Sequence, residues 1–197
     1  PNVQVWSWDE KEQHTAQVFS LKRDLKRSYT AVYNIGSGNL YQVTDDKLPG
    51  LRTADNGDVD LAFVFTTEPY GTQSMWTRRQ FFDMYTFNLA TGEKKQFKTK
   101  FNSMMNFSPE GKYAYWYCDQ DSSWYTRNMA DGKEYRLTTP ATFPAWNIDN
   151  DVPDHPRAYG CAGWTDGDEF ILIKDRYDIW KFDPKGEDKP INLTVNG

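Results

Sequence analysis

The 197 residues are ample for one hydrophobic core, and 28 acidic against 23 basic side chains give a net charge of -5. This mild charge argues against nucleic acid or an anionic membrane as a partner, and no apolar run approaches the roughly 18 residues of a membrane span. Aromatic residues make up 16% of the chain, with eight Trp and twelve Tyr. Large rings in an otherwise polar sequence favour many short strands over a helical bundle.

The N-terminal region predicts three strands separated by a polar segment. Residues Val3 to Trp8 alternate apolar and polar side chains, which is typical of a strand. Residues 9–27 are polar and are read either as a solvated loop or as one or two helical turns, with the loop favoured. Residues 28–33 and 39–44 are predicted as two further strands.

One turn pattern recurs along the chain: an Asn or Asp, then a Gly, then an apolar residue that begins the connection to the next unit. It occurs at Asn34, Gly38 and Val43-Thr44; at Asn88, Gly92 and Phe97-Lys98; at Asn128, Gly132 and Leu137-Thr138; and, in a looser copy, at Asp183, Gly186 and Leu193-Thr194. Glycine supplies the positive φ that such a hairpin turn requires. The recurrence indicates a repeat architecture.

A second spacing supports the same repeat. Val43 to Gly57 is fourteen residues, and Phe97 to Gly111 is again fourteen. Where the spacing is longer, it predicts an insertion of about fourteen residues between Glu68 and Gln80, and one of about sixteen residues at 140–156. Four units therefore share one framework and differ in two loops.

The densest unit is 102–139, with four strand-like runs in about forty residues. In the run from Lys112 to Cys118, Tyr113, Tyr115 and Tyr117 are predicted on one face, opposite Ala114, Trp116 and Cys118. Apolar residues on both faces suit a sheet that is stacked between two others.

These patterns predict an all-β fold, a partial β-propeller of about four four-stranded antiparallel blades that is open rather than closed. The blades are expected at about 1–46, 47–100, 101–139 and 140–197, within a single propeller segment. Neither end of the chain supplies the missing strand of the first blade, so we expect exposed blade edges and self-association through them. A complete four-bladed ring is the weaker alternative.

Little in the sequence suggests catalysis. Gly36-Ser37-Gly38 lies in a predicted hairpin turn and lacks the frame of a nucleophile elbow. The two histidines, His14 and His155, are each expected in a polar loop, and no phosphate loop or Cys/His metal motif occurs. Cys118 and Cys161 are read as two buried thiols, with a disulfide between them left open.

Three acidic clusters are present at Asp119-Gln120-Asp121, Asp149-Asn150-Asp151 and Asp166-Gly167-Asp168. Calcium uses such oxygen ligands, but none of the clusters has the spacing of a known calcium loop. Asp and Asn also gather in turns, because their side chains bond to nearby backbone groups, and this interpretation is preferred.

The two insertions are the candidate functional segments, since long loops on a rigid scaffold often make contacts. The first, 71–80, places Trp76 beside Arg78 and Arg79 and is a candidate peptide-contact loop. The second, 147–157, carries His155 and Arg157 and is a candidate rim loop. The alternative is that either loop only covers a blade edge or packs against another domain.

Several stretches resemble the propeller of the prolyl oligopeptidase family of serine peptidases, and its large bacterial members in particular. The most specific stretch has Tyr-Gly-Cys-Ala-Gly-Trp-Thr at 159–165 and Asp-Arg-Tyr-Asp-Ile-Trp at 175–180. Ser-Pro-Glu-Gly-Lys-Tyr at 108–113 is similar too, although other propellers share it. The resemblance spans nearly the whole chain.

In that family the propeller caps an α/β-hydrolase domain, admits short or flexible peptides and excludes folded proteins. The resemblance therefore implies a C-terminal α/β-hydrolase domain of a parent chain as partner, peptides as substrates, and a periplasmic or secreted location. The hydrolase segment is not in this sequence, so no catalytic residue carries over. By itself the chain is expected to be neither an enzyme nor a binder of cofactors or metals. The alternative is a TolB-like scaffold that binds a protein or glycan without catalysis.

Overall fold

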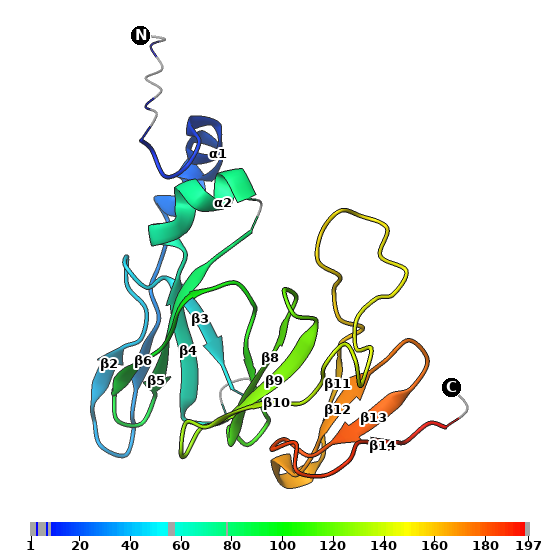
Figure 1. The fold of residues 1–197 in the computed structure, drawn as a ribbon. Helices are drawn as coiled ribbons and strands as arrows, with labels where there is room; N and C mark the ends of the chain where they lie inside the picture. Colours follow the sequence, from blue (N-terminus) through cyan, green and yellow to red (C-terminus); the bar gives the residue numbers. More distant parts are fainter. Residues whose placement is uncertain (1–2, 4–6, 8, 55–57, 78, 196–197) are drawn as a thin grey trace. The chain divides into compact units, whose positions relative to one another are not determined.

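The computed structural model describes residues 3, 7, 9–54, 58–77 and 79–195 (Figure 1). The described strands form three four-stranded sheets and one two-stranded sheet, and in every sheet neighbouring strands follow chain order. Sequential strand order is that of a propeller blade. The predicted all-β fold of propeller blades is confirmed. Gly57, Arg78 and most of the predicted strand from Val3 to Trp8 lie outside the described residues.

The chain divides into two compact units, Pro1–Arg52 with Asp60–Asn102, and Thr53–Val59 with Ser103–Gly197. In the first unit, strands β1 (Ala31–Tyr33) and β2 (Leu40–Gln42) pair antiparallel. They confirm the strands predicted at 28–33 and 39–44, in shorter form. The four-stranded sheet of this unit consists of β3 (Gly50–Thr53), β4 (Leu61–Thr66), β5 (Phe82–Asn88) and β6 (Lys94–Phe101).

The core of the first unit lies on both faces of β4. Ala62, Phe63 and Val64 are fully buried, although neighbouring residues of a strand point to opposite faces. Val64 packs in a cluster with Phe87 and other apolar residues, while the Phe63 ring meets Phe97 edge to face at 5.1 Å. Burial on both faces is the environment expected for a stacked blade.

The sequence analysis favoured a loop over helical turns for residues 9–27. The structure instead has helix α1 (His14–Asp24) in this segment. His14 is therefore the first residue of a helix and does not lie in a loop. The helix buries none of its residues, so it lacks the core-facing apolar stripe that identifies a helix in a sequence. Lys22 and Arg23 in its last turn complement the helix dipole.

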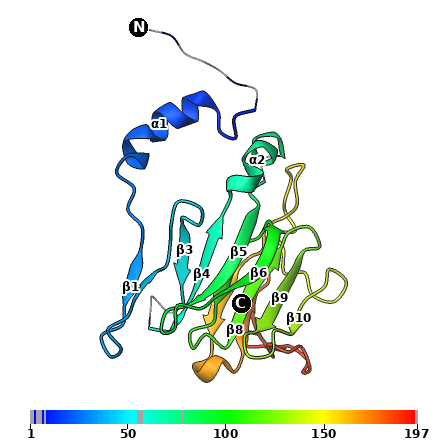
Figure 2. The ribbon, with the colours of Figure 1, turned by 90° about the vertical axis from the view of Figure 1, so that its left-hand side faces the viewer.

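The insertion between Glu68 and Gln80 is likewise helical. It forms a short 3-10 helix, η2 (Glu68–Tyr70), followed by α2 (Gly71–Thr77). Figure 2 shows α2 at one end of β4 and β5, within the first unit.

The second unit contains two four-stranded sheets. One consists of β7 (Asn106–Phe107), β8 (Tyr113–Cys118), β9 (Ser123–Asn128) and β10 (Glu134–Arg136). The other consists of β11 (Cys161–Trp164), β12 (Ile171–Lys174), β13 (Ile179–Phe182) and β14 (Ile191–Asn192), with a 3-10 turn, η3 (Asp166–Asp168), between β11 and β12. The sheets β1–β2, β7–β10 and β11–β14 lie inside the expected ranges 1–46, 101–139 and 140–197, while the sheet β3–β6 runs from Gly50 to Phe101, one residue past the expected 47–100.

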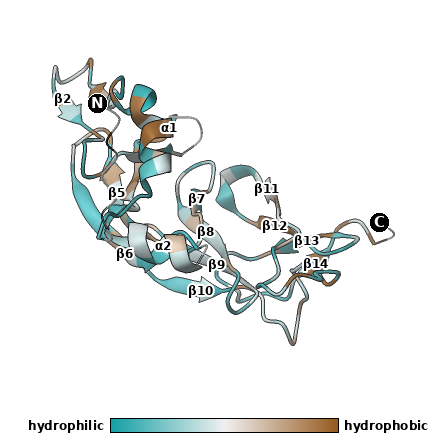
Figure 3. Cartoon of the chain, turned by 90° about the horizontal axis from the view of Figure 1, so that it is seen from above, coloured by the Kyte–Doolittle hydropathy of each residue, from teal (hydrophilic) through white to brown (hydrophobic). Residues whose placement is uncertain are grey.

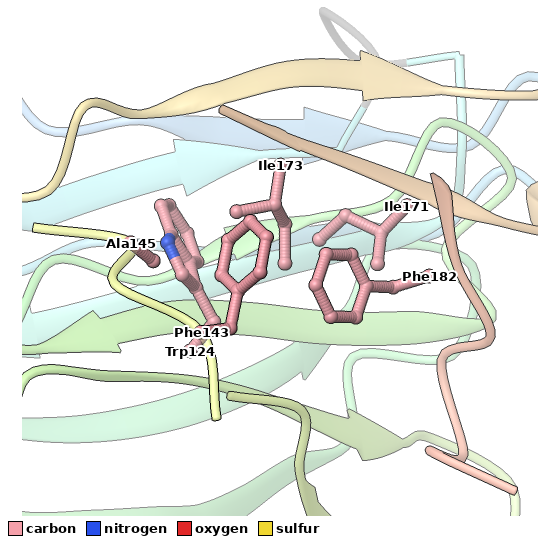
Figure 4. Close-up of a cluster of buried hydrophobic side chains, with 6 residues drawn as sticks. All are labelled: Trp124, Phe143, Ala145, Ile171, Ile173 and Phe182. Atoms are coloured by element: carbon pink, nitrogen blue, oxygen red, sulfur yellow. The ribbon is translucent and has the colours of Figure 1, made fainter. Parts of the chain in front are cut away.

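Two clusters of rings show that β8 is buried on both faces, as predicted. Tyr113 stacks on Trp164 with ring centroids 5.6 Å apart, and Trp116 stacks on Tyr125 at the same distance. The apolar core between the sheets contains Trp124, Phe143, Ala145, Ile171, Ile173 and Phe182. In Figure 4 the Phe143 and Phe182 rings lie beside the two isoleucines.

The predicted turn repeat is present in all four sheets. Gly38, Gly92, Gly132 and Gly186 have φ between 66° and 74°, so each takes the left-handed conformation. In each turn the glycine N–H donates to the carbonyl of the Asn or Asp that opens it, at 2.8–2.9 Å. The side chain of that residue accepts a further backbone N–H, as the Asn88 amide oxygen does from Ala90 at 2.9 Å. The turn therefore stabilises itself locally.

Three of the four repeats end with a threonine whose hydroxyl forms a hydrogen bond that the spacing alone did not predict. The hydroxyls of Thr44, Thr138 and Thr194 accept the backbone N–H of Thr30, Trp124 and Ile179, at 2.8–3.1 Å. Each hydroxyl thus extends the bonding between the third and fourth strands. Lys98 stands at the equivalent position of the sheet β3–β6, where the register of β5 and β6 is irregular.

A buried carboxylate links the two sheets of the second unit. Asp168, only 2% exposed, accepts the Ser108 hydroxyl at 2.5 Å and the N–H groups of Glu110 and Lys112 at 3.1 Å. These donors belong to the Ser-Pro-Glu-Gly turn between β7 and β8. Asp168 therefore joins η3 of one sheet to the first turn of the other.

Candidate functional site

Both insertions leave their sheets at the equivalent end. In an antiparallel sheet whose strands follow chain order, successive connections alternate between the two ends of the sheet. The connection from the second to the third strand and the segment that leaves the fourth strand therefore lie at one end. The turns from the first to the second strand and from the third to the fourth strand lie at the opposite end. The helical insertion joins β4 to β5, and the long loop joins β10 to β11. Each lies at the end away from the Asn–Gly turns of its own unit. In a propeller this end of the blades forms one rim.

The helical insertion is anchored by Asp83 at the start of β5. The Tyr70 hydroxyl donates to Asp83 at 2.6 Å, and the Lys100 N–H donates to the same carboxylate at 3.0 Å. Burial, together with the Asp83 carboxylate, raises the pKa of Tyr70, so its proton stays in place at neutral pH. The Tyr70 ring also packs against Phe81 at 5.9 Å. The chain entering α2 is therefore held to the sheet.

The segment before α1 lies close to α2. A Cβ on Gly71 would lie only 2.6 Å from the carbonyl oxygen of Lys11, so only glycine permits this approach without displacement. Lys11 also forms an ion pair with Glu68 in η2. The first helix and the insertion consequently form one surface of the first unit.

Two hollows open on this surface. Of the two described candidate residues, Trp76 lines one hollow and Arg79 lines the other. A hollow of about 450 Å³ has Trp76 and Met75 on one side and His14, Glu10 and Glu12 on the other. A second hollow of about 490 Å³ is lined by Met75, Phe19 and the cations Lys11, Arg23 and Arg79. Trp76 itself is 84% exposed. Trp76 therefore lines a hollow with two carboxylates, whereas Arg79 lines one with Lys11 and Arg23, and Glu12 borders both hollows.

The loop of the second unit is held by hydrogen bonds at its base. Trp146 and Ala158 form an isolated antiparallel bridge, and the Asn147 N–H donates to the Arg157 carbonyl at 2.8 Å. Further along, the Tyr117 hydroxyl donates to the Pro156 carbonyl at 3.1 Å. Figure 1 shows this loop extending beyond β10 and β11. The hydrogen bonds at its base fix it to the sheets of its own unit.

Within this loop the two candidate residues lie on the returning segment. His155 and Arg157 are both exposed, and the His155 backbone N–H donates to the Asp154 carboxylate at 2.8 Å. Across from them, Arg176 of the β12–β13 turn forms an ion pair with Asp149 at 3.0 Å and lies 5.3 Å from the ring centre of Tyr177. Tyr177, which the sequence analysis did not single out, is 68% exposed. An exposed ring beside arginine is an arrangement suited to contacts with peptides.

The cysteines offer no activated nucleophile. Cys118 and Cys161 are free thiols, half-buried where the sequence predicted burial, and the disulfide left open by the sequence is not formed. Burial raises the pKa of both thiols, which keeps them protonated at neutral pH. The sulfur of Cys161 lies 3.4 Å from the Gly163 carbonyl, as expected for a packed thiol.

The acidic clusters act as turn and packing elements. Among the described residues, no group of three or more His, Cys, Asp or Glu has the arrangement of a metal site. Asp121 accepts the hydroxyl of Tyr125 and lies 3.5 Å from Arg136, while Asp168 forms the link to Ser108 described above. In the sequence Asp168 was visible only as part of the acidic cluster Asp166-Gly167-Asp168, because its partner Ser108 lies 60 residues away.

No protein-family model matches the chain, and no curated protein matches it. Solved structures similar to it include TolB from Acinetobacter baumannii, 15% identical over 86% of this chain and 38% of that protein, with a TM-score of 0.44. A putative TolB from Agrobacterium tumefaciens is 15% identical over 80% of this chain and 51% of that protein, with a TM-score of 0.46. The chain thus spans 38% and 51% of the length of these two proteins.

The described helices include none with the length and apolar character needed to cross a bilayer. The longest, α1, has eleven residues, and two basic residues lie in its last turn.

Proposed function

We propose that this chain is a non-catalytic β-propeller segment of a prolyl oligopeptidase-like serine peptidase, whose rim restricts and guides peptides toward an α/β-hydrolase domain. The observation that carries the proposal is that both insertions extend from the equivalent end of their blades. Loops at that end of a propeller blade are in position to screen what passes the propeller. The resemblance of residues 159–180 to that family supplies the peptidase context.

The chemistry of the two rim segments suits peptides. An extended peptide presents carbonyl oxygens, side chains and a charged terminus, which aromatic rings and guanidinium groups can contact. Trp76 and Arg79 lie on the first insertion, and His155 and Arg157 on the second. Each contact of these side chains with a peptide is weak by itself, so a peptide is guided past the propeller and is not held tightly.

The first test asks whether the chain hydrolyses peptides. The purified 197-residue chain is incubated with chromogenic dipeptides and tripeptides, and no release above the buffer blank is expected. Appreciable hydrolysis that survives repurification and is unaffected by inhibitors of contaminating proteases contradicts a non-catalytic role.

The second test asks whether the rim contacts peptides. Chemical shifts of backbone amides are followed while unstructured pentapeptides of mixed sequence are added, and shifts are expected in residues 71–80 and 147–157. Trp76→Ala and Arg157→Ala should reduce the shifts in their own segments. Lys133→Ala, at the opposite end of a blade, is the matched control and should leave them unchanged. Shifts confined to other surfaces contradict the guiding role.

The alternative is a TolB-like scaffold that binds a protein or glycan partner without any peptidase. It is favoured by the exposed apolar side chains of α1, where Phe19 is 90% and Val18 58% exposed. Figure 3 shows hydrophobic and hydrophilic residues side by side on this helix. The coding sequence downstream of Gly197 separates the two proposals. A Gly-x-Ser-x-Gly followed by Asp and His supports the peptidase, and further blades followed by a stop codon support the scaffold.

A further inference from the structure

The larger of the two hollows at the first insertion is rich in cations. Lys11, Arg23 and Arg79 line it, and Glu12 is the one acidic side chain among its described lining residues. The chain as a whole has the opposite balance, with 28 acidic and 23 basic side chains. Three cations around one hollow of an acidic chain create a local field that attracts anions.

The carboxylates of the chain leave part of this positive charge available. Lys11 forms an ion pair with Glu68. Arg23 lies 3.6 Å from Asp24, but the same carboxylate accepts a shorter hydrogen bond, at 2.7 Å, from Arg27. The Arg23 side chain is also 77% exposed, so its guanidinium group can reorient toward a bound anion.

The same hollow contains apolar surface. Phe19 of α1 and Met75 of α2 both line it, and they are 90% and 38% exposed. An aromatic ring and a flexible thioether offer a contact area that adapts to an apolar group. Figures 1 and 2 show the two helices at the same end of the first unit. Positive charge and apolar surface therefore meet in one place.

The last residue of a peptide has the chemistry that fits this hollow. A terminal carboxylate carries one negative charge at neutral pH, and guanidinium groups bind carboxylates through paired N–H donors. The last side chain is attached to the carbon next to that carboxylate, so one residue presents both an anion and an apolar group. A volume of about 490 Å³ is typical of pockets for small ligands and is too small for a folded protein.

The surroundings of the hollow select for a single negative charge. Lys11 is already paired with Glu68, and Glu12 borders the hollow, so the remaining positive charge matches one carboxylate and not a dianion. The neighbouring hollow contains Glu10 and Glu12 and therefore repels a carboxylate. An anion at this surface is accordingly directed to the hollow that contains Arg79.

We propose that the hollow lined by Lys11, Arg23 and Arg79 binds the carboxyl terminus of a peptide whose last side chain is apolar. Arg23 and Arg79 contact the carboxylate, and Phe19 and Met75 contact the side chain. The inference rests on the proposed function, because peptides reach this hollow only if the rim contacts them. It adds a direction to that contact, with the carboxyl end of the peptide at the first insertion.

The first experiment compares four peptides on the full 197-residue chain by backbone amide shifts. The reference is acetyl-Ser-Ala-Ser-Ala-Leu, in which the terminal carboxylate is the only charge. It should bind at least about fivefold more tightly than its carboxamide, because only the acid forms an ion pair. Acetyl-Ser-Ala-Glu-Ala-Leu carboxamide, with its carboxylate inside the chain, and acetyl-Ser-Ala-Ser-Ala-Ser acid, without the apolar end, should both bind more weakly than the reference.

The outcomes separate this inference from the proposed function. Equal affinity of the reference acid and its carboxamide, with shifts in residues 71–80 for both, overturns the inference and leaves the guiding role standing. Absence of shifts with all four peptides overturns the guiding role and the inference with it. Equal affinity of the Glu-containing carboxamide contradicts the choice of a terminal carboxylate, and equal affinity of the Ser-terminated acid contradicts the apolar contact.

The second experiment uses substitutions that each remove one positive charge. Arg23→Gln and Arg79→Gln should each weaken binding of the reference acid at least about threefold and leave the carboxamide unaffected. Lys22→Gln is the matched control, because Lys22 is the exposed neighbour of Arg23 on α1 and does not line the hollow. Circular dichroism checks that the helices are retained in each variant. Equal losses in Arg23→Gln and Lys22→Gln, or no loss in either arginine variant, overturn the assignment.

Discussion

Asp168 is buried beside two loops, and its carboxylate is satisfied by three donors from one neighbouring turn. Its own φ is 55°, a left-handed conformation that Asp and Asn tolerate better than other side chains. A buried carboxylate with several N–H and O–H donors is a stable arrangement as long as all the bonds are made. Asp168 therefore adds a polar link between the two sheets of the second unit, beside the apolar core that they share.

Asp168→Asn should lower the free energy of unfolding by about 1–3 kcal/mol, because an amide cannot accept all three donors and leaves one of them unsatisfied. Asn tolerates the same backbone conformation, so the change isolates the hydrogen bonds. Urea denaturation followed by tryptophan fluorescence measures the effect. Asp166→Asn, at an exposed position of the same turn, is the control and should change the stability little. Equal losses in both variants would contradict this role.

Tyr125 shows how a half-buried polar pair responds to pH. Burial, with the Asp121 carboxylate adding to it, raises the pKa of Tyr125 from 10.0 to about 12. A folded pKa above the unfolded value means that the stabilisation is fully present below pH 10 and is lost as the pH rises toward 12. The free energy of unfolding, measured between pH 10 and pH 12, should fall more steeply with pH in the wild type than in Tyr125→Phe.

Asp121→Asn provides the control for this titration. With the carboxylate replaced by an amide, one cause of the shift disappears and the pKa of Tyr125 should fall toward its usual value while burial still raises it. Ultraviolet absorbance of tyrosinate, taken as the difference from Tyr125→Phe in each background, reports the midpoint. An unchanged midpoint in Asp121→Asn would assign the whole shift to burial.

At the scale of elements, the repeated turn is the unit that organises the fold. Each copy combines a glycine of positive φ, an Asn or Asp that bonds to its own turn, and a hairpin between the third and fourth strands. The pattern was readable in the sequence because it is local: every bond in it joins residues at most five positions apart along the chain. Such turns need no help from distant residues to form.

Gly92→Ala should destabilise the protein by more than the ~1–2 kcal/mol that a left-handed residue with a Cβ costs, because the added Cβ would also lie 2.4 Å from the Tyr41 ring. Gly36→Ala is the matched control, since Gly36 has no positive φ and its nearest contact would be 3.5 Å away. Thermal unfolding of both variants gives the comparison. Similar shifts in melting temperature would contradict a special role for the turn glycine.

At the scale of the whole molecule, net charge acts on any association between copies. Each chain carries a net charge of -5, while the exposed residues Tyr33, Ile35 and Leu40 of β1, β2 and their turn are apolar and uncharged. Copies of the chain should therefore repel one another at a distance. If exposed blade edges bring copies together, as the sequence analysis expects, raising the salt concentration from about 0.02 to 0.5 M should strengthen that association, since salt screens the repulsion and leaves apolar burial intact. Sedimentation equilibrium in the two buffers measures this, and association that weakens with salt would indicate an ionic interface.

The helices show where reading the sequence failed. Residues 9–27 were expected as a loop and form α1, and the insertion after Glu68 is helical as well. Neither α1 nor α2 buries a residue. Because the periodic apolar pattern that predicts a helix arises from burial of one helix face, these two segments do not need that pattern. The candidates Trp76 and Arg79, close together in the sequence, line different hollows, because α2 ends at Thr77 and Arg79 lies beyond the helix on the way to β5.

The sequence by itself determined the propeller blades. Apolar strands and self-contained turns that open with Asn or Asp specify, through interactions between residues close in the chain, the three four-stranded sheets and the two-stranded sheet that the structure describes. Only the tertiary structure decided which distant groups meet, such as Asp168 with Ser108 and Tyr70 with Asp83. Burial and charge at these contacts depend on packing between elements, and spacing along a chain carries no record of that packing.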